Sequence, residues 1–453
     1  MNQPIRRLLV ANRGEIAVRI LRACRELGIE TVQVYSEADR DSLPVRMADR
    51  AVCIGPARAA DSYLRGDFIV SAALTCGAQA IHPGYGFLSE KAAFARLCRD
   101  AGLIFVGPTP EVIELMGEKS QARRMAVAAG VPVTPGSEGT VKDAAEAQRE
   151  ADRIGYPVLL KAAAGGGGRG MRRVDRAQDL EESYVAASRE ALAAFGDGAL
   201  YVERFLTRVR HIEVQILSDG HNVLHLGERD CSIQRRNQKL VEESPSPALA
   251  PALRERIGEA AVQLCRHVGY TSAGTIECIL DETTGDFFFM EMNTRVQVEH
   301  PVTELVTGID IVKEQIRIAQ GTPLRWRQED VRLRGHAIEC RINAEDPDAG
   351  FAPSPGQLGR VNWPSGPGIR VDTHVVAGDR IPPYYDSLLG KVLAWGSDRQ
   401  EALDRMARAL DELQLEGLTT TAAFHRALMD NPDFRRGDVH TRYVEEVLWK
   451  DRS

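Results

Sequence analysis

Residues 6–42 read RRLLVANRGEIAVRILRACRELGIETVQVYSEADRDS and decide the fold class of the first part of the chain. An apolar strand leads through an Asn-Arg-Gly turn into a helix whose apolar face includes Ile16, Ile20 and Cys24. Gly28 ends this helix, and TVQVYS begins a second strand. Because QAIHPGYGFLSE and LIFVGP continue the alternation of strands and helices, the sequence predicts an α/β domain with a parallel sheet.

A dinucleotide-binding domain is the first alternative for such a start. Its first turn would carry G-x-G-x-x-G, in which the glycines let the backbone approach a pyrophosphate. The turn here reads NRGEIA and lacks those glycines. The sequence therefore predicts a Rossmann-like fold but disfavours a nicotinamide-dependent dehydrogenase.

The rest of the chain predicts further domains, so that the whole is an α/β and α+β multidomain protein. Turn-rich VPVTPGSEGT at 131–140 indicates a boundary, and the segment 135–205 after it has the size of a lid-like subdomain. HIEVQILSDG and HNVLHLGERD alternate like the strands of a hairpin. A late helix follows Asp398, which is a candidate N-cap. We expect domains at 1–115, 116–334 and 335–453, with the lid at 135–205 inside the second.

Composition narrows the function classes. The chain has 453 residues and a formal net charge of -7, which argues against nucleic acid or an anionic membrane as its main partner. No run approaches the ~20 apolar residues of a membrane span, and the N-terminus has no secretory h-region, so a cytoplasmic protein is expected. The eight cysteines form no C-x-x-C pair or zinc-like cluster, which predicts reduced and mostly buried thiols.

A glycine run is the first motif that suggests a phosphate-binding site. Gly165–Gly168 and Met171 follow an apolar strand that ends at Lys161, and backbone N–H groups in such a loop can surround phosphate oxygens. A flexible linker is the alternative, which the flanking strands disfavour. The run does not fit the Walker A pattern. Lys161 and Lys119 are candidates for a positive charge beside a phosphate.

A hairpin supplies candidate metal ligands. The stretch TIECILDETTGDFFFMEMN at 275–293 reads as two strands around a turn, and pairing centred near Thr284 sets Glu277 opposite Glu291. Directly opposed carboxylates lie roughly 5 Å apart and repel unless a cation lies between them. Mg²⁺ fits that need, and Asn293 on the same face offers a third oxygen. An exposed hairpin face is the alternative, which the neighbouring FFFM disfavours.

Polar residues continue at alternate positions through FFFMEMNTRVQVEH, residues 287–300. Arg295 can clamp a planar anion with two parallel hydrogen bonds, and Glu299 is a candidate base. Both continue along the same face, so metal ligands, an anion clamp and a base would then share one strip. The charged stretch ERDCSIQRRNQKLVEE at 228–243 is, taken alone, most often a salt-bridged surface.

Seven motifs together resemble biotin carboxylase, an ATP-grasp enzyme. In chain order they are VANRGEIAVRI, IHPGYGFLSE, LMGEK, KAAAGGGGRGM, ERDCSIQRRNQK, EMNTRVQVEHPVTE and GHAIECRINAEDP, and the resemblance extends from Leu8 to about Tyr443. It implies a Rossmann-like N-terminal domain, an ATP-grasp central region with a mobile lid, and a C-terminal mixed α/β domain. It also implies that ATP phosphorylates bicarbonate to carboxyphosphate, which breaks down to CO₂ that carboxylates biotin.

The resemblance implies a role for particular residues. The ATP site would comprise Lys119, Lys161, Gly167, Gly168, Met171, Glu203, Leu206, His211, Gln234, Asn237, Glu277 and Glu291. Mg²⁺ (or Mn²⁺) would be held by Glu277, Glu291 and Asn293. The bicarbonate and biotin site would comprise Lys239, Arg295, Gln297, the backbone of Val298, Arg341, Tyr85 and Glu90. Glu299 would be the base, and Arg341 would stabilise the biotin enolate.

Departures from the family pattern do not remove a residue assigned to chemistry. Asn237 replaces a usual histidine, Ala164 shortens the glycine run, and Arg204 replaces a common lysine, which together suggest a paralogue. No Met-Lys-Met biotinylation signature occurs. Biotin is therefore expected on a separate carrier protein, or the chain is a module of a longer carboxylase.

The resemblance leaves several functional alternatives open. The leading hypothesis is the biotin carboxylase subunit of an acyl-CoA carboxylase such as acetyl-CoA carboxylase. It would work as a homodimer with a biotin carboxyl carrier protein and a carboxyltransferase. The alternatives are the same module in a pyruvate- or urea-type carboxylase, or a catalytically silent nucleotide-binding scaffold.

Overall fold

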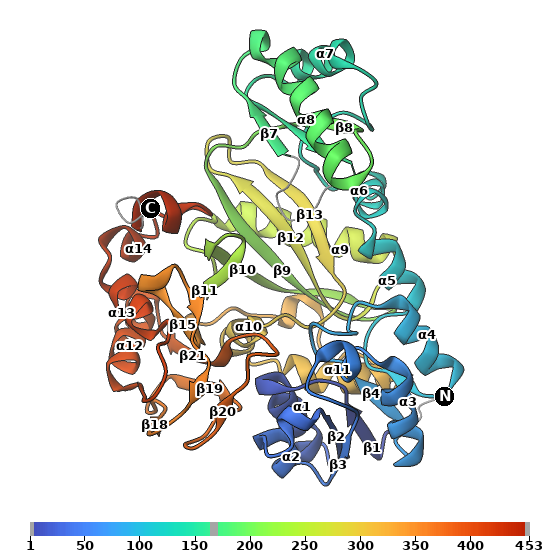
Figure 1. The fold of residues 1–453 in the computed structure, drawn as a ribbon, viewed down its shortest axis with the longest axis vertical. Coiled ribbons are helices and arrows are strands. Elements are labelled where there is room, and N and C mark those ends of the chain that lie inside the picture. The colour runs from blue at the N-terminus through green and yellow to red at the C-terminus, as the bar shows by residue number, and fades with distance from the viewer. Residues whose placement is uncertain (1–3, 164–170, 449–453) are drawn as a thin grey trace. The chain divides into compact units, whose positions relative to one another are not determined.

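The computed structural model describes residues 4–163 and 171–448 (Figure 1). Its chain divides into two compact units. The first comprises Met1–Val131, Arg210–Cys278 and Glu291–Ser453, and the second comprises Pro132–Val209 and Ile279–Met290. The predicted mixed α/β architecture is confirmed. The three-domain division and the lid stay predictions.

The first unit begins with the predicted parallel sheet. Its strand order is β3-β2-β1-β4-β5, with the first strand in the middle as in doubly wound folds. The strands are β1 Arg7–Val10, β2 Glu30–Tyr35, β3 Arg50–Cys53, β4 Ala80–His82 and β5 Ile104–Phe105. The helices are α1 Gly14–Glu26, α2 Leu43–Met47, α3 Gly66–Thr75, α4 Ala92–Asp100, α5 Pro110–Gly117 and α6 Lys119–Ala128.

Helix α1 forms where the apolar spacing predicts it. Ile16, Ile20 and Cys24 are fully buried, as is Leu8 in the neighbouring strand, so the four-residue repeat faces the core. Gly28 has a φ of +69°, a left-handed conformation that suits glycine after a helix end.

An eight-stranded sheet follows, with the order β13-β12-β9-β10-β11-β14-β21-β19. These strands are β9 Val209–Asp219, β10 Val223–Arg235, β11 Gln238–Ser244, β12 Thr271–Asp281, β13 Phe287–Asn293, β14 His336–Asn343, β19 Ile369–Thr373 and β21 Leu388–Gly396. The pairs from β9 through β10, β11, β14 and β21 to β19 are antiparallel. Both predicted hairpins, β9–β10 and β12–β13, are present as neighbouring strands.

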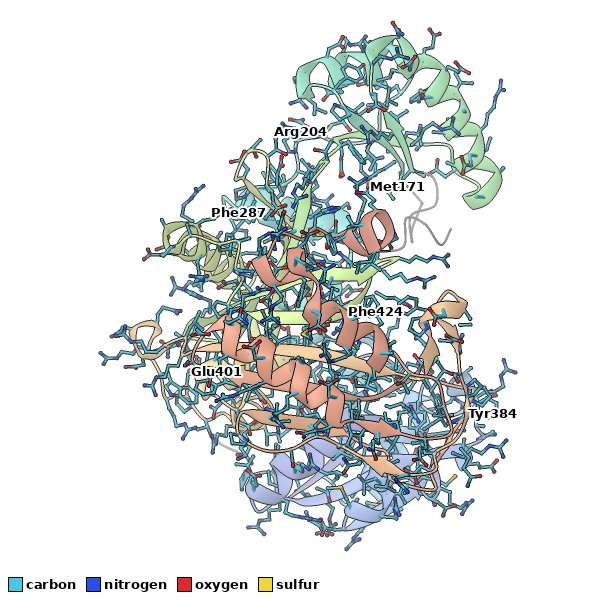
Figure 2. All side chains as sticks on the ribbon, turned by 90° about the vertical axis from the view of Figure 1, so that its left-hand side faces the viewer. Met171, Arg204, Phe287, Tyr384, Glu401 and Phe424 are labelled. Atoms are coloured by element: carbon cyan, nitrogen blue, oxygen red, sulfur yellow. The ribbon has the colours of Figure 1, made fainter. Side chains whose placement is uncertain are left out.

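Helices of the first unit pack on this sheet. They are α9 Pro251–His267, α10 His300–Thr307, α11 Ile311–Ala319, α12 Arg399–Glu412, α13 Ala422–Asp430 and α14 Pro432–Arg436. Figure 2 shows α12, with Glu401, and α13, with Phe424, lying in front of the C-terminal strands, and α12 packs on β21 and β14. Asp398 caps α12 by accepting a hydrogen bond from the Glu401 amide, as predicted.

Short two-stranded ladders complete the C-terminal part. They pair β15 Glu345–Asp346 with β16 Ala352–Pro353, β17 Gly356–Gln357 with β20 Arg380–Ile381, and β18 Val361–Asn362 with β22 Gln414–Leu415. All eight cysteines carry free thiols and six are buried, as predicted. Within the described ranges, no helix has the length and apolar character needed to cross a membrane.

The second unit has its own core. Strands β6 Val158–Ala162, β7 Met171–Val174 and β8 Leu200–Arg204 form an antiparallel sheet in the order β7-β6-β8, with helices α7 Ala144–Ile154 and α8 Leu180–Phe195. Leu160 and Val202 in this core are fully buried. Lys161 pairs with Met171, which confirms that strands flank the glycine run. The predicted phosphate ligands Gly167 and Gly168 lie outside the described residues.

Candidate active site

A cluster of buried charges gathers on neighbouring strands of the large sheet. Lys239 on β11 donates hydrogen bonds to Glu277 Oε1 on β12 at 3.1 Å, to Glu299 Oε1 at 2.8 Å and to Glu213 on β9. Each of these three carboxylate side chains is at most 7% exposed. Burial would lower the pKa of Lys239, but the carboxylates more than offset it and raise that pKa. Lys239 is therefore a cation held in place at the centre of the cluster.

The predicted base, Glu299, lies between two cations. Its Oε1 accepts from Lys239, and its Oε2 accepts from Arg341 Nη2 on β14 at 3.1 Å. Burial would raise the pKa of Glu299, but Lys239, Arg341 and Arg229 bring it well below its ordinary value. The side chain is thus an ionised carboxylate, the state a general base needs before it accepts a proton.

Arg341 is held from both sides. Its Nε donates to Glu242 Oε1 on β11 at 2.6 Å, and its backbone carbonyl accepts from Thr421 Oγ1 at 2.8 Å and lies 2.7 Å from His425 Nε2. Burial would lower the pKa of Arg341, whereas Glu242 and Glu299 raise it. Its guanidinium is a permanent positive charge, suited to an oxyanion that develops nearby.

Helix α10 explains how Glu299 reaches this cluster. The residue is the N-cap of α10, which packs against β10, β11, β14 and β21. Strand β13 ends at Asn293, so the expected strip along one strand is wrong for residues 295–299. Asn293 belongs to the strand, whereas Glu299 is placed by a turn and a helix start.

Arg295 is surrounded by acceptors of the protein. Its Nε donates to Glu90 Oε2 at 2.8 Å, its Nη1 to Gln297 Oε1 at 2.7 Å and its Nη2 to Asn293 Oδ1 at 2.9 Å. The structure therefore brings four predicted site residues together. The anion clamp at Arg295 stays a prediction. An anion that bound there would have to displace some of these hydrogen-bond partners.

The other predicted residue of that motif, Tyr85, contacts a different carboxylate. Its hydroxyl donates to Glu15 Oε1 on α1 at 2.5 Å. Val298 is contacted through its carbonyl, which accepts from Lys391 Nζ on β21 at 2.6 Å. Because the Val298 carbonyl is bonded to Lys391, bicarbonate that binds the Val298 backbone would do so through the N–H group.

The predicted metal ligands fit a hard cation in part. Glu277 is nine-tenths buried, and its pKa is lowered because Lys239 and His211 outweigh the effect of burial, so it is an ionised oxygen ligand. Asn293 Nδ2 and Gln297 Nε2 donate to Glu277 Oε1 at 2.8 and 2.9 Å. These bonds confirm the shared face of Glu277 and Asn293, which is buried at both residues. The Glu291 side chain, by contrast, is 40% exposed.

The third predicted ligand, Glu291, lies 3.6 Å from Lys119 Nζ. Among the described residues, the groups with metal-like spacing are His211 with Glu213 and Glu277, and Glu213 with Cys231 and Glu299. Glu291 belongs to neither group, so the set Glu277, Glu291 and Asn293 stays a prediction. Its carboxylates are nevertheless the donor type that Mg²⁺ prefers.

Residues predicted to bind ATP lie in both units. In the second unit, Lys161 on β6 forms an ion pair with Glu203 on β8. Met171 begins β7 and is exposed, and Leu206 follows β8. In the first unit, His211 Nε2 lies 3.1 Å from Glu277 Oε2.

Two further predicted residues lie in the hairpin of β10 and β11, Gln234 near the end of β10 and Asn237 in the turn. Gln234 is buried and lies opposite Lys239 in the ladder. Asn237 and Arg236 form the turn itself, with φ of +64° and +47°. Asparagine adopts this left-handed conformation more readily than most residues. The replacement of the family's histidine by Asn237 thus suits the backbone of an exposed turn.

The interpretation of residues 228–243 as a salt-bridged surface is wrong for most of the stretch. Arg229 is fully buried and donates to Glu213 Oε2 at 3.0 Å, and Glu242 is fully buried beneath Arg341. Both faces of these strands are covered, so charged residues are buried in pairs. Sequence reasoning missed Glu213, Glu15 and Lys391. The alternation of HIEVQIL places Glu213 two residues after His211 on one face and was the available signal for Glu213.

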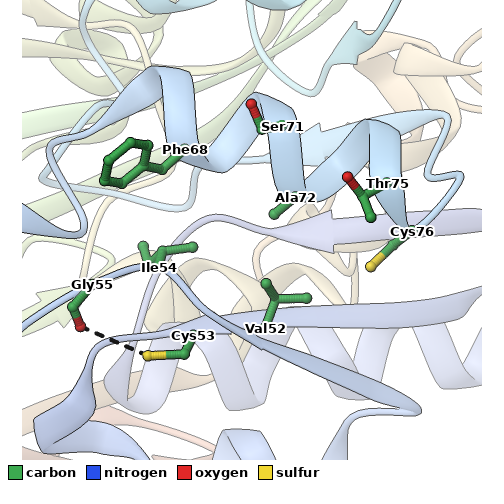
Figure 3. A pocket seen from close by; sticks show the side chains of 9 residues that line it. All are labelled: Val52, Cys53, Ile54, Gly55, Phe68, Ser71, Ala72, Thr75 and Cys76. Atoms are coloured by element: carbon green, nitrogen blue, oxygen red, sulfur yellow. Dashed lines mark hydrogen bonds between the residues drawn. The ribbon is translucent and has the colours of Figure 1, made fainter.

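A mostly apolar pocket of about 410 Å³ lies elsewhere in the first unit, between the edge strand β3 and helix α3 (Figure 3). Figure 3 shows Phe68 and Ala72 of α3 on one side and Val52 and Ile54 on the other. None of its lining residues belongs to the predicted site. The charged cluster and this pocket are separate features.

Family models match three successive parts of the chain. They are the biotin carboxylase N-terminal domain at residues 4–113, the ATP-binding domain of the carbamoyl-phosphate synthase L chain at 118–327, and the biotin carboxylase C-terminal domain at 339–446. Together these models account for most of the 453 residues.

Individual relatives are similar along nearly the whole chain. A biotin carboxylase of Nostoc sp. strain PCC 7120 is 58% identical over 97% of this chain and 99% of its own length. A solved structure of the biotin carboxylase subunit of pyruvate carboxylase has 52% identity and a TM-score of 0.89, covering 98% of each chain. A solved structure of the biotin carboxylase domain dimer of Hydrogenobacter thermophilus 2-oxoglutarate carboxylase, in complex with MgADP, ADP and bicarbonate, has 53% identity and a TM-score of 0.90, covering 99% and 98%. The chain belongs to the biotin carboxylase family.

Proposed function

We propose that this protein carboxylates biotin in an ATP-dependent reaction with bicarbonate as the carbon source. The observation that supports this most directly is Glu299, a buried ionised carboxylate held between Lys239 and Arg341. A base flanked by two cations can accept a proton from an anionic substrate, because the cations offset the repulsion between the two anions.

The residues of the cluster take successive roles in this reaction. Glu299 accepts the proton of bicarbonate, and the bicarbonate oxygen then attacks the γ-phosphorus of ATP, releasing ADP. The carboxyphosphate formed in this way breaks its C–O bond to give CO₂ and phosphate. The phosphate released in that step accepts the proton from N1′ of biotin, and the nitrogen then adds to CO₂ to form carboxybiotin. Arg341 stabilises the negative charge on the biotin ureido oxygen during this last step.

Lys239 and Arg295 hold the bicarbonate in this proposal, with the backbone N–H of Val298. Glu277, Glu291 and Asn293 would hold Mg²⁺, whose charge would offset that of the ATP phosphates. Lys119, Lys161, His211, Gln234 and the hinge residues Glu203 to Leu206 contact the nucleotide. The solved biotin carboxylase domain of 2-oxoglutarate carboxylase is likewise a complex with MgADP and bicarbonate.

The biotin is proposed to arrive on a separate carrier protein, and a carboxyltransferase then uses the carboxybiotin. We propose an acyl-CoA carboxylase as the complete enzyme and a homodimer as the working form. The relatives include components of carboxylases named for pyruvate and for 2-oxoglutarate, so the same chain architecture serves different final acceptors. Co-purification from the source cell tests this assignment, because the carrier and transferase that accompany the chain identify the acceptor.

The activity is tested by bicarbonate-dependent ATP hydrolysis in the presence of free biotin. We expect the rate to rise with biotin and to require a divalent cation. A chain that binds ATP but shows no stimulation at any biotin concentration would instead be a silent nucleotide-binding scaffold. ATP binding is therefore measured separately, by calorimetry on the same preparation.

A further inference from the structure

Lys391 is a lysine with no exposed surface that lies beside the charged cluster. It occupies the middle of β21, directly opposite Arg341 on β14 and Asp372 on β19. Its side chain is 0% exposed, which is rare for lysine unless the charge is paired. The sequence motifs assign no role to this residue.

The ammonium group of Lys391 has two well-placed acceptors. It donates to the backbone carbonyl of Val298 at 2.6 Å and lies 3.0 Å from Glu15 Oε1 on α1. Glu15 in turn accepts from the Tyr85 hydroxyl. Three segments far apart in the sequence thus meet at one buried ammonium group.

The charge of Lys391 is maintained despite its burial. Burial alone would lower its pKa, but Glu15, Glu339 and Asp372 more than offset this and raise the pKa. A charged ammonium donates strong hydrogen bonds, and its bond to a neutral carbonyl is stronger than one between two neutral groups. The Val298 carbonyl is therefore firmly held.

Holding this carbonyl has a consequence for the next residue. The peptide unit is planar, so the Val298 carbonyl and the Glu299 N and Cα atoms move as one rigid plane. On its other side, the Gln297 carbonyl lies 2.7 Å from His300 Nδ1 and accepts from the His300 amide at 3.3 Å. The backbone is thus anchored just before the base and again at the start of α10.

We propose that Lys391 is a positioning residue for Glu299: it fixes the Val298–Glu299 peptide so that the carboxylate stays between Lys239 and Arg341. Glu15 balances its charge, and through Tyr85 it links this anchor to the loop that carries Glu90. The inference rests on the proposed function, in which Glu299 is the base and the Val298 N–H contacts bicarbonate. It assigns no contact between Lys391 and a substrate.

The test removes the ammonium without leaving an unpaired buried charge. Lys391→Met alone leaves Glu15 uncompensated and is expected to destabilise the fold, so the informative variant is the pair Glu15→Gln with Lys391→Met. We expect this pair to lower kcat for bicarbonate-dependent ATP hydrolysis at least tenfold and to raise KM for bicarbonate. KM for ATP and the bicarbonate-independent hydrolysis are expected to stay within twofold of the wild type.

A second buried ion pair of the same unit serves as the matched control. Arg13 and Asp39 are bonded at 2.8 Å and nearly buried, and neither contacts a residue of the proposed site. The pair Arg13→Met with Asp39→Asn is expected to lose stability, measured by urea unfolding, while keeping the wild-type KM for bicarbonate.

The measurements distinguish a positioning role of Lys391 from a purely structural one and from failure of the proposed function. If the Lys391 pair behaves like the Arg13 pair, with lost stability but unchanged kcat and KM for bicarbonate, Lys391 is only structural and the inference is overturned. If the wild-type chain itself shows no bicarbonate-dependent turnover, the proposed function fails instead. A tenfold loss confined to the bicarbonate parameters supports the positioning role.

Discussion

Glu299 combines complete burial with ionisation, and that combination depends on its two cationic neighbours. Lys239 and Arg341 each contribute one hydrogen bond, and each contacts a second carboxylate as well, Glu277 and Glu242 respectively. Charges of both signs therefore alternate through the cluster. Such an arrangement keeps Glu299 ionised at neutral pH without leaving any of these charges unpaired.

The proposed role of Glu299 as the base predicts a large loss of activity when its carboxylate is replaced by a neutral amide. Glu299→Gln keeps the size of the side chain but cannot accept a proton. We expect it to lower bicarbonate-dependent ATP hydrolysis by about 10²- to 10⁴-fold, the usual contribution of a general base. ATP affinity, measured by calorimetry, is expected to stay near that of the wild type.

Glu314→Gln is the matched control for that prediction. Glu314 is equally buried and is paired with Arg317 and Arg325, but it lies on α11 and outside the proposed site. Its loss is expected to affect stability and to leave hydrolysis per folded molecule unchanged. Equal losses of ATP binding and turnover in Glu299→Gln would contradict the assignment of Glu299 as the base.

At the scale of elements, the buried side chain of Glu243 connects strand β11 to strand β14 and helix α12. Glu243 on β11 accepts from Arg399 Nε, at the start of α12, at 2.6 Å, and lies 2.7 Å from His336 Nε2 on β14. Arg399 also donates to the carbonyls of Phe434 and Arg435 in α14. The C-terminal helices are thus fastened to the sheet through one carboxylate.

This fastening predicts a pH dependence of stability. Burial would raise the pKa of Glu243, but Arg399 and His336 lower it to about 2. A lowered pKa means that the ionised side chain stabilises the fold above its ordinary pKa and that this contribution is lost as the pH falls towards 2. Urea unfolding is therefore expected to show that Glu243→Gln costs about 1 kcal/mol less at pH 4 than at pH 7. A cost that is the same at both pH values would show that the charge of Glu243 is not what holds α12.

The elements also show how far the sequence alone leads. The four-residue repeat of Ile16, Ile20 and Cys24 predicted α1 correctly, and strand alternation predicted the shared face of Glu277 and Asn293. Alternation failed after Asn293, because polar residues at every second position also fit the turn that leads into α10. The contacts of Lys391 could not be predicted from the sequence, because its partners Glu15 and Val298 are distant in sequence and meet it only in the folded chain.

For the whole molecule, the division into two units with separate cores predicts separable effects on stability. Leu160 is fully buried in the second unit, and Leu393 is fully buried in the first. Each substitution to alanine is expected to cost about 2–5 kcal/mol within its own unit. Hydrogen exchange should show Leu160→Ala raising exchange at residues 132–209 and Leu393→Ala raising it in β14 and β21. Exchange that rises equally in both units for either variant would indicate a single cooperative unit.

A second prediction at this scale concerns the expected lid at 135–205. If this segment closes over ATP during the reaction, it excludes water from a labile carboxyphosphate. Limited proteolysis within these residues is then expected to slow when ATP and Mg²⁺ are added. Cleavage in the C-terminal strands serves as the internal control, and unchanged cleavage within 135–205 would count against the lid.

The hydrogen bonds of Arg295 affect how strongly an anion would bind to its guanidinium. Its charge is balanced by Glu90, Nη1 donates to Gln297 and to the Val296 carbonyl, and Nη2 donates to Asn293. If Arg295 binds bicarbonate as proposed, the anion exchanges with some of these partners, and its net binding free energy is the difference between two sets of similar bonds. Weak binding of this kind would let the bound anion leave Arg295 rapidly.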